Sequence, residues 1–346
     1  MNRIKCGFLA TGSMGLSHVK LVREEFPGAA EITAVCDTHG PNLDKAKESA
    51  PEAKTYSDPE QLIADQNVEA IFISTPGFTH ADFTAKCLKA KKHIFGEKPV
   101  MTTRQGVQDM VRLAEQHPDR VVLINHELRY SRYFQKVKDL IDAGEIGEPQ
   151  LVWCKEYRGP FLKKVGDWIQ DARYSGGCLV DKNCHHFDLM NWWIGSRPKR
   201  VCGFGGNDVV RVVGNEYEVI DHASVSFEFE NGVRGGLLLC MFSPKLQEDL
   251  EMGVIGSEGM IQTRMSKDEI HQWKRGNSTA DPIVHHVPSR KVGGGAHHGF
   301  IEAHAAFFNA IKEKQRPLTD VRDCWQGTML AIAAEEAIAN GTVVQV

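Results

Sequence analysis

The chain reads Ala10-Thr11-Gly12-Ser13-Met14-Gly15 between an apolar stretch, residues 5–10, and a helix-periodic stretch, residues 15–25. Gly12 has no Cβ, so the backbone there can approach a pyrophosphate, and the first turn of the helix supplies free N–H donors to the anion. Gly15 lets the helix pack close to the sheet. Ala10 stands where the G-x-G-x-x-G pattern usually has its first glycine. The strand–turn–helix context predicts a dinucleotide-binding turn in which Gly12, Ser13 and Met14 contact the cofactor.

A carboxylate at the end of the next strand bears on the choice of cofactor. Asp37 closes the predicted strand 32–37 and stands 25 residues after Gly12, where it can accept hydrogen bonds from both ribose hydroxyls. A 2′-phosphate at that place would be repelled by about 1 kcal/mol or more. The following residues, Thr38-His39-Gly40, include no Arg or Lys to bind such a phosphate. The sequence therefore favours NAD over NADP.

The first 125 residues alternate strand-like and helix-like stretches. The predicted strands are residues 5–10, 32–37, 70–74, 92–95 and 121–125, and the predicted helices are residues 15–25, 43–50, 81–90 and 105–115. Repeated βα units with short connections predict a parallel, doubly wound sheet, that is, an N-terminal Rossmann domain over residues 1–125.

The pattern changes in the second part, residues 126–346. Alternating strand patterns follow one another at 150–157, 199–205, 221–230, 233–242, 250–255 and 260–263, and helical stretches lie at 131–143, 300–311 and 321–339. Asn231-Gly232 between two strands is a strong hairpin signal. These features predict a C-terminal α+β domain with a large, mostly antiparallel open sheet, half-buried on one face.

Composition excludes several classes of protein. The 346 residues suggest two domains, and Lys+Arg total 41 against 45 Asp+Glu, so the net charge is −4, which argues against a nucleic-acid partner. No apolar run approaches the ~18 residues of a membrane span. The nine cysteines are scattered without a C-x-x-C pair, as in a reducing compartment. We expect a cytoplasmic protein that forms a homodimer or homotetramer through the open face of its sheet.

Further segments carry a resemblance to a known family. They are Ser74-Thr75-Pro76-Gly77-Phe78-Thr79-His80, Gly96-Glu97-Lys98-Pro99, the stretch GGCLVDKNCHHFD at 176–188, and LEMGVIGSEGM at 250–260. In this order and spacing they resemble the glucose-fructose oxidoreductase / inositol dehydrogenase (Gfo/Idh/MocA) family over essentially the whole chain.

The resemblance implies roles for single residues. Lys98 matches a lysine that contacts substrate beside the nicotinamide, and Asp181 and His185 match the carboxylate and imidazole of the catalytic set. The residues implied on the cofactor side are Thr75, Pro76, His80, Glu97, Lys98 and Pro99. Gly77 departs from the family pattern, which often has a ribose-contacting Asn at this position.

The chemistry of these side chains agrees with the implied roles. Oxidation of a secondary alcohol needs a base for the hydroxyl proton, and the histidine side chain, here His185, titrates near neutrality. Asp181 lies four residues earlier on a predicted helix, residues 179–194, so it can share the same face and orient the imidazole. Lys98 can donate to the alcohol oxygen and stabilise developing negative charge.

Other residues are expected near the substrate. Aromatic faces and guanidinium groups suit a polyhydroxylated ring, which points to Tyr157, Arg158, Trp168, Arg173 and Lys182, with Lys98, Asp181 and His185, as substrate contacts. The pair His297-His298 could line the same cleft. The Cys and His residues around Asp181 fit no common zinc spacing, so we expect no metal.

The leading interpretation is an NAD-dependent dehydrogenase or reductase that moves a hydride between the nicotinamide and a secondary hydroxyl or ketone of a sugar, cyclitol or sugar derivative. An alternative keeps the fold and uses transient oxidation for redox-neutral elimination or glycosidic cleavage, with Lys182, Cys184 or His186 as an extra acid or base. A nucleotide-sensing regulator without catalysis is less favoured, because Lys98, Asp181 and His185 are all present.

Overall fold

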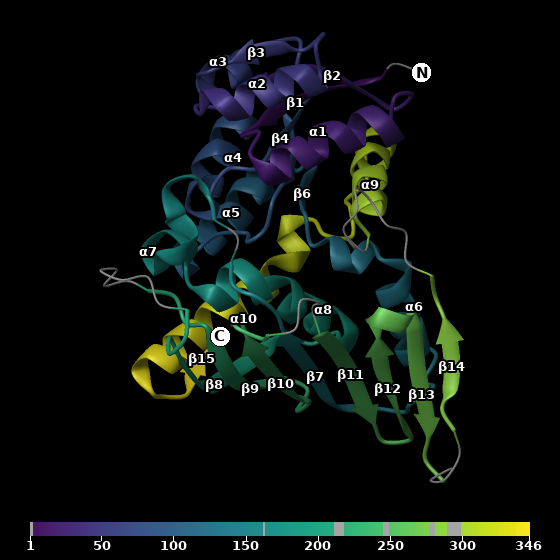
Figure 1. The fold of residues 1–346 in the computed structure, drawn as a ribbon. Helices are drawn as coiled ribbons and strands as arrows, with labels where there is room; N and C mark the ends of the chain where they lie inside the picture. Colours follow the sequence, from purple (N-terminus) through teal and green to yellow (C-terminus); the bar gives the residue numbers. More distant parts are fainter. Residues whose placement is uncertain (1–2, 162, 211–217, 245–248, 277–280, 289–298) are drawn as a thin grey trace. The chain divides into compact units, whose positions relative to one another are not determined.

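A computed structural model describes residues 3–161, 163–210, 218–244, 249–276, 281–288 and 299–346 (Figure 1). The chain divides into two compact units. Most of the first is Met1–Glu127 with Gly299–Trp325, and most of the second is Leu128–Lys291 with Gln326–Val346. The first unit is thus built from two separate stretches of sequence.

The first unit contains a parallel sheet in the order β3-β2-β1-β4-β5-β6 among its described residues. Strand order therefore reverses direction between β1 and β4, as in a doubly wound Rossmann fold, and the predicted fold class is confirmed. Its strands are β1 Ile4–Leu9, β2 Ala30–Cys36, β3 Lys54–Tyr56, β4 Ala70–Ile73, β5 His93–Gly96 and β6 Val122–Ile124. Its helices are α1 Ser13–Glu25, α2 Gly40–Ser49, α3 Pro59–Ala64, η1 Gly77–Thr79, α4 His80–Lys89, α5 Arg104–Gln116 and α9 Phe300–Glu313.

A row of phenylalanines across neighbouring strands forms the core of this unit. Phe8 on β1 pairs with Phe72 on β4, which pairs with Phe95 on β5, and the ring centroids stack 4.6 and 4.8 Å apart. Phe307 on α9 meets the last two rings edge-on, an arrangement that aromatic quadrupoles favour. Helix α9 therefore belongs to the core of the Rossmann unit although it lies near the C-terminus of the chain.

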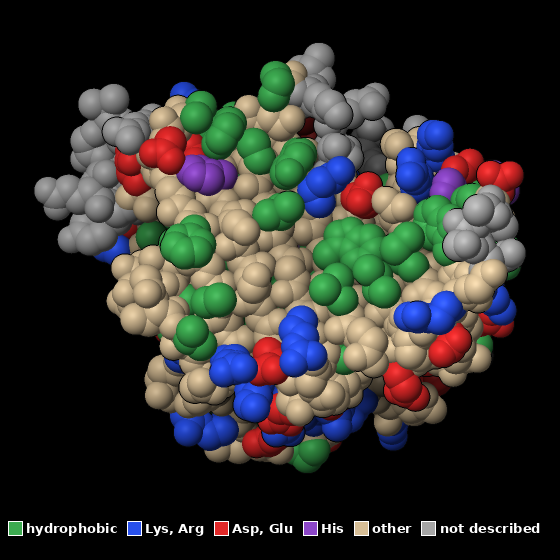
Figure 2. Space-filling model, turned by 90° about the horizontal axis from the view of Figure 1, so that it is seen from below, with side chains coloured by type: hydrophobic (Ala, Val, Ile, Leu, Met, Phe, Trp, Pro, Cys, Tyr) green, Lys and Arg blue, Asp and Glu red, His purple; other side chains and the backbone are tan. Residues whose placement is uncertain are grey.

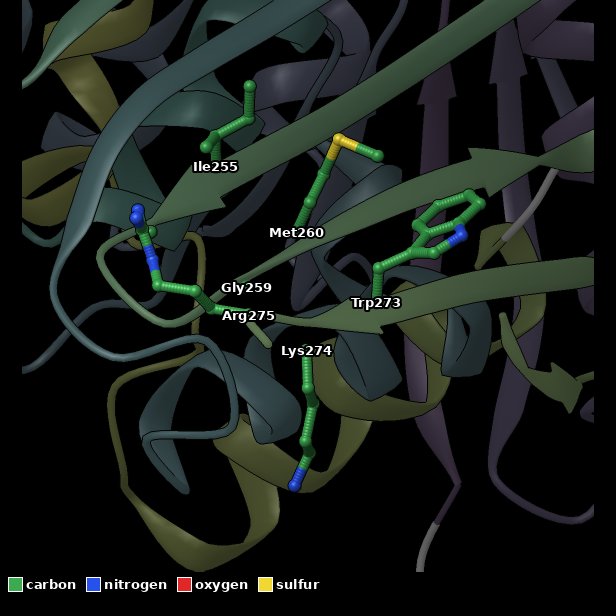
Figure 3. Close-up of a pocket in the computed structure, with 7 residues that line it drawn as sticks. Ile255, Gly259, Met260, Trp273, Lys274 and Arg275 are labelled. Carbon is green, nitrogen blue, oxygen red and sulfur yellow. The ribbon is translucent and has the colours of Figure 1, made fainter. Parts of the chain in front are cut away.

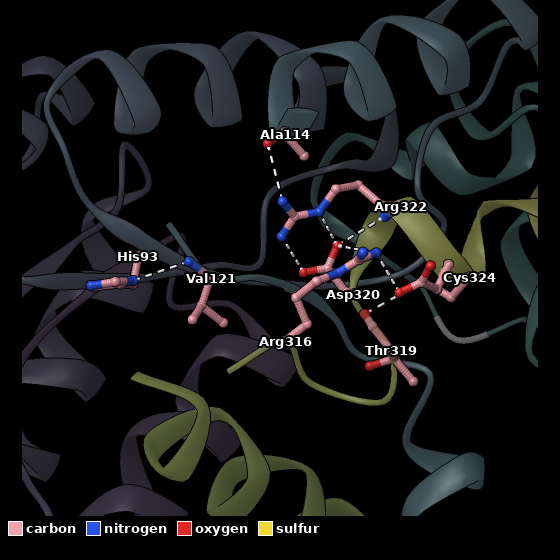
Figure 4. A network of polar contacts seen from close by, with 9 residues as sticks. His93, Ala114, Val121, Arg316, Thr319, Asp320, Arg322 and Cys324 are labelled. Atoms are coloured by element: carbon pink, nitrogen blue, oxygen red, sulfur yellow. Dashed lines mark hydrogen bonds and ion pairs between the residues drawn. The ribbon is translucent and has the colours of Figure 1, made fainter. Parts of the chain in front are cut away.

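The segment after α9 is fixed to the same unit by polar contacts (Figure 4). At the end of β6, the Ile124 N–H donates to the Thr319 carbonyl at 3.0 Å, and the Thr319 hydroxyl donates to the Ile124 carbonyl at 2.6 Å. Arg322 donates to both carboxylate oxygens of Asp320, each at 2.6 Å, and to the Ala114 carbonyl on α5 at 3.5 Å. This segment leads into α10 Val321–Asn340.

The second unit contains a sheet in the order β14-β13-β12-β11-β7-β10-β9-β8-β15 over its described residues. All neighbours are antiparallel except β7 and β10, which confirms the predicted mostly antiparallel sheet. The strands are β7 Pro149–Tyr157, β8 Pro198–Gly206, β9 His222–Phe229, β10 Arg234–Cys240, β11 Asp249–Gly256, β12 Gly259–Arg264, β13 Glu269–Lys274, β14 Ile283–His286 and β15 Val344–Gln345. The helices are η2 Glu127–Tyr130, α6 Arg132–Asp142, η3 Val165–Gln170, α7 Ala172–Ser175, η4 Leu179–Asn183, α8 Cys184–Ile194 and η5 Met265–Lys267.

Local sequence signals account for much of this second sheet. The Asn231-Gly232 hairpin forms as predicted, with Gly232 at φ +86° between antiparallel β9 and β10. One face of the sheet is covered by α8, whose Phe187 meets Phe227 of β9 at 5.6 Å. None of the helices within the described ranges is long and apolar enough to cross a membrane.

The predicted helix 179–194 is wrong in its first turn. Residues Leu179–Asn183 form a π-helix, and the α-helix proper, α8, starts only at Cys184 and ends at Gly195 in the left-handed conformation. Hydrophobic periodicity cannot distinguish a single π-helical turn from the first turn of an α-helix, because both are short and lead into the same apolar helix. Such turns are frequent at functional sites.

Candidate active site

The turn between β1 and α1 has the geometry of an anion-binding loop. Ala10 adopts a left-handed φ of +66°, and Gly12 caps α1 with no side chain bonded to the N–H groups of its first turn and no acidic residue there. A Cβ on Gly12 would meet only Asn42 Nδ2, at 3.8 Å, whereas a Cβ on Gly15 would lie 1.9 Å from the Ala10 carbonyl oxygen. Gly15 is thus required by the turn itself, and Gly12 leaves open space over free donors.

Asp37 fixes this turn by accepting hydrogen bonds from it. It is buried and its Oδ2 accepts from the Thr11 N–H at 2.7 Å and from Asn42 Nδ2 at 3.3 Å. Its Oδ1 accepts one hydrogen bond from the residues that the structure describes, the His39 N–H at 2.8 Å. A carboxylate oxygen has two lone pairs, so Oδ1 retains acceptor capacity for a ribose hydroxyl.

The predicted cofactor-side loop, Thr75 to His80, packs against the Glu97-Lys98-Pro99 turn. His80 is buried, with Nε2 3.0 Å from the Thr75 carbonyl and Nδ1 2.9 Å from the Pro99 carbonyl. Burial lowers the pKa of His80 most strongly, and its backbone contacts oppose that shift. Each ring nitrogen faces a carbonyl oxygen of a different loop, so His80 links the two loops.

Gly77, which departs from the family pattern, lies in a tightly packed place. A Cβ at this position would lie 3.2 Å from Cδ and Cγ of Pro99 and 3.2 Å from Thr102 Cγ2. A side chain at position 77 would therefore need Pro99 and Thr102 to shift by a few tenths of an ångström. Glycine at position 77 therefore suits the close approach of the two loops.

Glu97 and Asn125 lie at the carboxyl ends of the adjacent strands β5 and β6, where doubly wound sheets bind their ligands. Oε1 of Glu97 accepts from Asn125 Nδ2 at 2.8 Å and from His18 Nε2 at 2.9 Å. Burial raises the pKa of Glu97, but His18, Lys98 and Asn125 together outweigh it and lower the pKa to about 2. Oδ1 of Asn125 is buried with no hydrogen-bond partner among the described residues, so it is a ready acceptor for an amide. The sequence analysis did not identify Asn125.

In the second unit, Asp181 lies in the π-helix and is buried, and His185 lies half-buried in the first turn of α8. The turn before them is held from α10. The Leu179 N–H donates to Glu335 Oε1 at 2.6 Å, and a Cβ on Gly177, which has φ +104°, would lie 2.4 Å from Glu335 Cδ. Gly177 thus lets a carboxylate reach the start of the segment that carries Asp181.

A buried charged cluster lies beside this segment. Glu156 on β7 is 1% exposed, and its Oε1 lies 3.1 Å from Lys182 Nζ and 3.5 Å from Arg158 Nη1. Its Oε2 accepts from Asn183 Nδ2 at 2.9 Å and lies 3.5 Å from His186 Nδ1. Burial raises the pKa of Glu156, but Lys182, His186 and Arg158 together lower it. Sequence reasoning missed Glu156, although its place in the inward-facing row with Val152 and Cys154 is unusual for a carboxylate.

The remaining predicted substrate residues are not brought together with this cluster. Tyr157 alternates with Glu156 on β7 and so points to the other sheet face, where Lys155 Nζ lies 5.6 Å from its ring centroid. Trp168 is half-buried in η3, and Arg173 is exposed and forms a two-pronged ion pair with Asp171. His297-His298 lies outside the described residues. Within the described ranges no group of three or more His, Cys, Asp or Glu side chains is arranged to hold a metal ion.

Comparison with known proteins agrees with this architecture. Residues 4–126 match the model of an oxidoreductase family with an NAD-binding Rossmann fold, and residues 134–262 match the GFO/IDH/MocA C-terminal domain. The scyllo-inositol 2-dehydrogenase (NAD(+)) of Bacillus subtilis is 25% identical over 99% of this chain and 96% of its own length. The myo-inositol 2-dehydrogenase of Thermotoga maritima is 29% identical over 67% of each chain.

Solved structures show the same fold over the full length. An oxidoreductase domain protein from Kribbella flavida superimposes with a TM-score of 0.88 at 20% identity, covering 100% of both chains. A levoglucosan dehydrogenase in complex with NADH and levoglucosan gives a TM-score of 0.87 at 19% identity, again over 100% of both. The two domain models in order, together with this fold, make the chain a member of the Gfo/Idh/MocA family of NAD-dependent oxidoreductases.

Proposed function

We propose that this enzyme transfers a hydride between NAD and a secondary hydroxyl or ketone on the ring of a sugar or cyclitol. The observations that carry the proposal are two residue sets, each within its own unit: the Glu97-Lys98-Pro99 turn at the end of β5, and Asp181 with His185 at a π-to-α transition. Relatives named as inositol dehydrogenases over nearly the whole chain support the substrate class.

The residues of the first unit suit the cofactor. The N–H groups at the start of α1 would hold the pyrophosphate over Gly12, Asp37 Oδ1 would accept a ribose hydroxyl, and Asn125 Oδ1 would accept from the carboxamide. NAD, when bound, supplies a carbon that accepts the hydride from the substrate.

The chemistry of the chain's own residues follows from their types. In the oxidation direction, His185 takes the proton of the substrate hydroxyl as the C–H hydride leaves the same carbon, so a ketone forms. Asp181 stabilises the imidazolium that results, and Lys98 donates to the substrate oxygen while negative charge develops there. The reverse direction uses the same groups with His185 as the acid.

The environment of two further residues favours net redox over the redox-neutral alternative. Elimination needs an additional acid or base, for which the candidates are Lys182, Cys184 and His186. Cys184 is buried, and the other two lie beside a carboxylate. Both face the buried Glu156 carboxylate, at 3.1 and 3.5 Å, and are therefore engaged in charge compensation. The test is to follow NADH and substrate together: equal amounts of NADH and ketone support the proposal, and substrate loss without NADH contradicts it.

We also propose that the enzyme is a homo-oligomer formed through the open face of its sheet. That face carries exposed apolar side chains on adjacent strands, among them Leu151, Leu238 and Ile255 at 42, 45 and 39% exposure (Figure 2). Ile255, Met260 and Trp273 pair across β11, β12 and β13 and line a shallow hollow (Figure 3). Contiguous apolar patches of this kind mark association sites.

A cytoplasmic location is part of the same proposal. All nine cysteines lie in the described residues and are free, and seven of them are buried. Burial raises the pKa of the Cys6 thiol well above its usual range and that of Cys36 and Cys87 to about 12. Thiols kept in this state are typical of a reducing compartment.

A further inference from the structure

A chain of buried polar groups runs through the Rossmann unit behind the Glu97-Lys98-Pro99 turn. Oε1 of Glu97 lies 2.9 Å from Nε2 of His18 on α1, and Nδ1 of His18 lies 3.0 Å from Nε2 of His304 on α9. Nδ1 of His304 then lies 2.7 Å from the carbonyl oxygen of Phe300. Both imidazoles are completely buried, so water cannot supply alternative partners.

The three links of this chain fix the number of protons it holds. The Phe300 carbonyl only accepts, so His304 Nδ1 must carry a proton, and each of the other two links also needs one. Two neutral imidazoles supply only two protons. Without a third, His18 Nδ1 and His304 Nε2 would face each other with lone pairs at 3.0 Å. The geometry therefore requires one proton beyond the two neutral rings.

The third proton has three possible positions: on Glu97, on His18 or on His304. Glu97 Oε1 also accepts from Asn125 Nδ2, which favours the carboxylate. His304 has the Phe300 carbonyl on one side and the His18 ring on the other. A positive charge on His304 would therefore have no anion beside it. His18 lies directly against Glu97, so the charge is compensated only on this ring.

We infer that His18 carries protons on both ring nitrogens and acts as the positioning residue that holds Glu97, and through it the Lys98 turn, in place. His304 is its neutral acceptor, and the pKa of His304, lowered well below the ordinary value by burial and then by His18, is consistent with that state. The effect on Lys98 rests on the function proposed above, whereas the protonation of His18 does not.

The surroundings of His18 suit a positive charge. Of the described residues, the titratable groups that face it are Glu97, from the turn after β5, and His304, from α9. Its other neighbours are the rings of Phe72, Phe95 and Phe300 at 5.7, 5.2 and 5.0 Å between centroids. Aromatic faces add cation–π attraction to the imidazolium. This chain of hydrogen bonds ends at the Phe300 backbone carbonyl. It therefore holds a proton and does not pass one on.

The direct test is nitrogen NMR of the histidine rings in the wild-type enzyme labelled with ¹⁵N-histidine. A coupling across the N–H···N hydrogen bond identifies the His18–His304 pair without any substitution. At pH 8.5 only about 1% of an unperturbed imidazole is protonated. We expect His18 to show two protonated nitrogens at this pH and His304 to show one, at Nδ1. His93, whose Nδ1 accepts from the Val121 N–H at 3.1 Å and whose pKa is lowered to about 4 mainly by burial, is the internal control and is expected to be neutral.

Three NMR outcomes would overturn the inference: a neutral His18, a doubly protonated His304, or no coupling between the two rings.

A kinetic test separates positioning from a merely structural role. His18→Asn is expected to lower kcat by about 10- to 100-fold and to shift the acid limb of the pH–rate profile upward, because Glu97 loses its cation. His117→Asn, at the end of α5, is the control, and identical profiles for the two variants would contradict positioning. Absence of turnover with every polyol would reject the proposed function and leave the NMR result decisive for His18.

Discussion

The backbone N–H of Leu179 donates a 2.6 Å hydrogen bond to Oε1 of Glu335. This bond joins the middle of α10 to the first residue of the π-helix that carries Asp181. Burial raises the pKa of Glu335 to about 7, and the hydrogen bond from Leu179 opposes that shift. A carboxyl group with a pKa near neutrality thus supports the segment that carries Asp181.

Glu335→Gln is expected to change the pH dependence of stability. The pKa of Glu335 is raised from 4.5 in the unfolded chain to about 7 in the fold. The stability from the protonated carboxyl is therefore fully present below pH 4.5 and is lost as pH rises through 7. Glutamine stays neutral, so the variant should gain about 3 kcal/mol relative to wild type between pH 4.5 and pH 8. Urea unfolding at pH 5 and pH 8 measures this, with Glu313→Gln on the exposed end of α9 as control. If the difference in unfolding free energy between the variant and wild type does not grow with pH, Glu335 does not have a raised pKa in the fold.

Lys98→Ala and His185→Ala are each expected to reduce turnover by about 100-fold or more while NAD binding stays largely intact. The reason is that both side chains act on the substrate oxygen and its proton, not on the pyrophosphate or ribose. Steady-state rates and NADH fluorescence titration separate the two effects. Lys89→Ala, on the exposed side of α4, controls for loss of a lysine. Wild-type turnover in both variants would disprove the assignment of these residues.

Asp37→Ala should weaken NAD binding and narrow the preference for NAD over NADP. It removes an acceptor for the ribose hydroxyl and the charge that repels a 2′-phosphate, and it also releases the Thr11 N–H. The expected loss is about tenfold in NAD affinity, the equivalent of one charge-assisted hydrogen bond. Titration with both reduced cofactors measures it. The control is Asp44→Ala, on the exposed side of α2. It also removes one negative charge from this part of the protein but leaves the hydrogen bond to the Thr11 N–H in place. Equal discrimination in the Asp37 variant and wild type would argue against the role of Asp37.

Ile255→Asp is expected to reduce the oligomeric state, because it places a charge among the exposed apolar side chains of the open sheet face. Leu318→Asp is the matched control: Leu318 has the same 39% exposure but lies in the first unit. Light scattering coupled to size exclusion reports the mass of each variant. A monomeric wild type, or an Ile255 variant that assembles like the control, would show that this face is not the interface.

Features encoded by neighbouring residues could be predicted from the sequence. The β1–α1 turn at Gly12, the Asn231-Gly232 hairpin and the helix end at Gly195 all depend on backbone conformations that a short motif specifies. The Glu97-Lys98-Pro99 turn was identified by its resemblance to the family.

Features that depend on partners distant in sequence could not be predicted in this way. His18 and His304 are 286 residues apart, and Glu156 finds Lys182 and His186 only through the packing of α8 on β7. The π-helix at Leu179–Asn183 was missed because its hydrogen-bond pattern leaves no mark on hydrophobic spacing. Glu156 had a usable signal, since a carboxylate in an inward-facing strand row needs cationic partners.

Anaerobic incubation of the purified enzyme with NAD and a panel of inositols, aldoses, sugar acids and anhydrosugars tests the central claim most directly. NADH is followed by its absorbance and the substrate by mass spectrometry, in parallel with NADP. We predict that one class of polyol yields NADH and the corresponding ketone in equal amounts, faster with NAD than with NADP. Consumption of substrate without NADH, or no turnover of any polyol by enzyme that binds NADH tightly, would contradict hydride transfer to a sugar or cyclitol ring as the function of this protein.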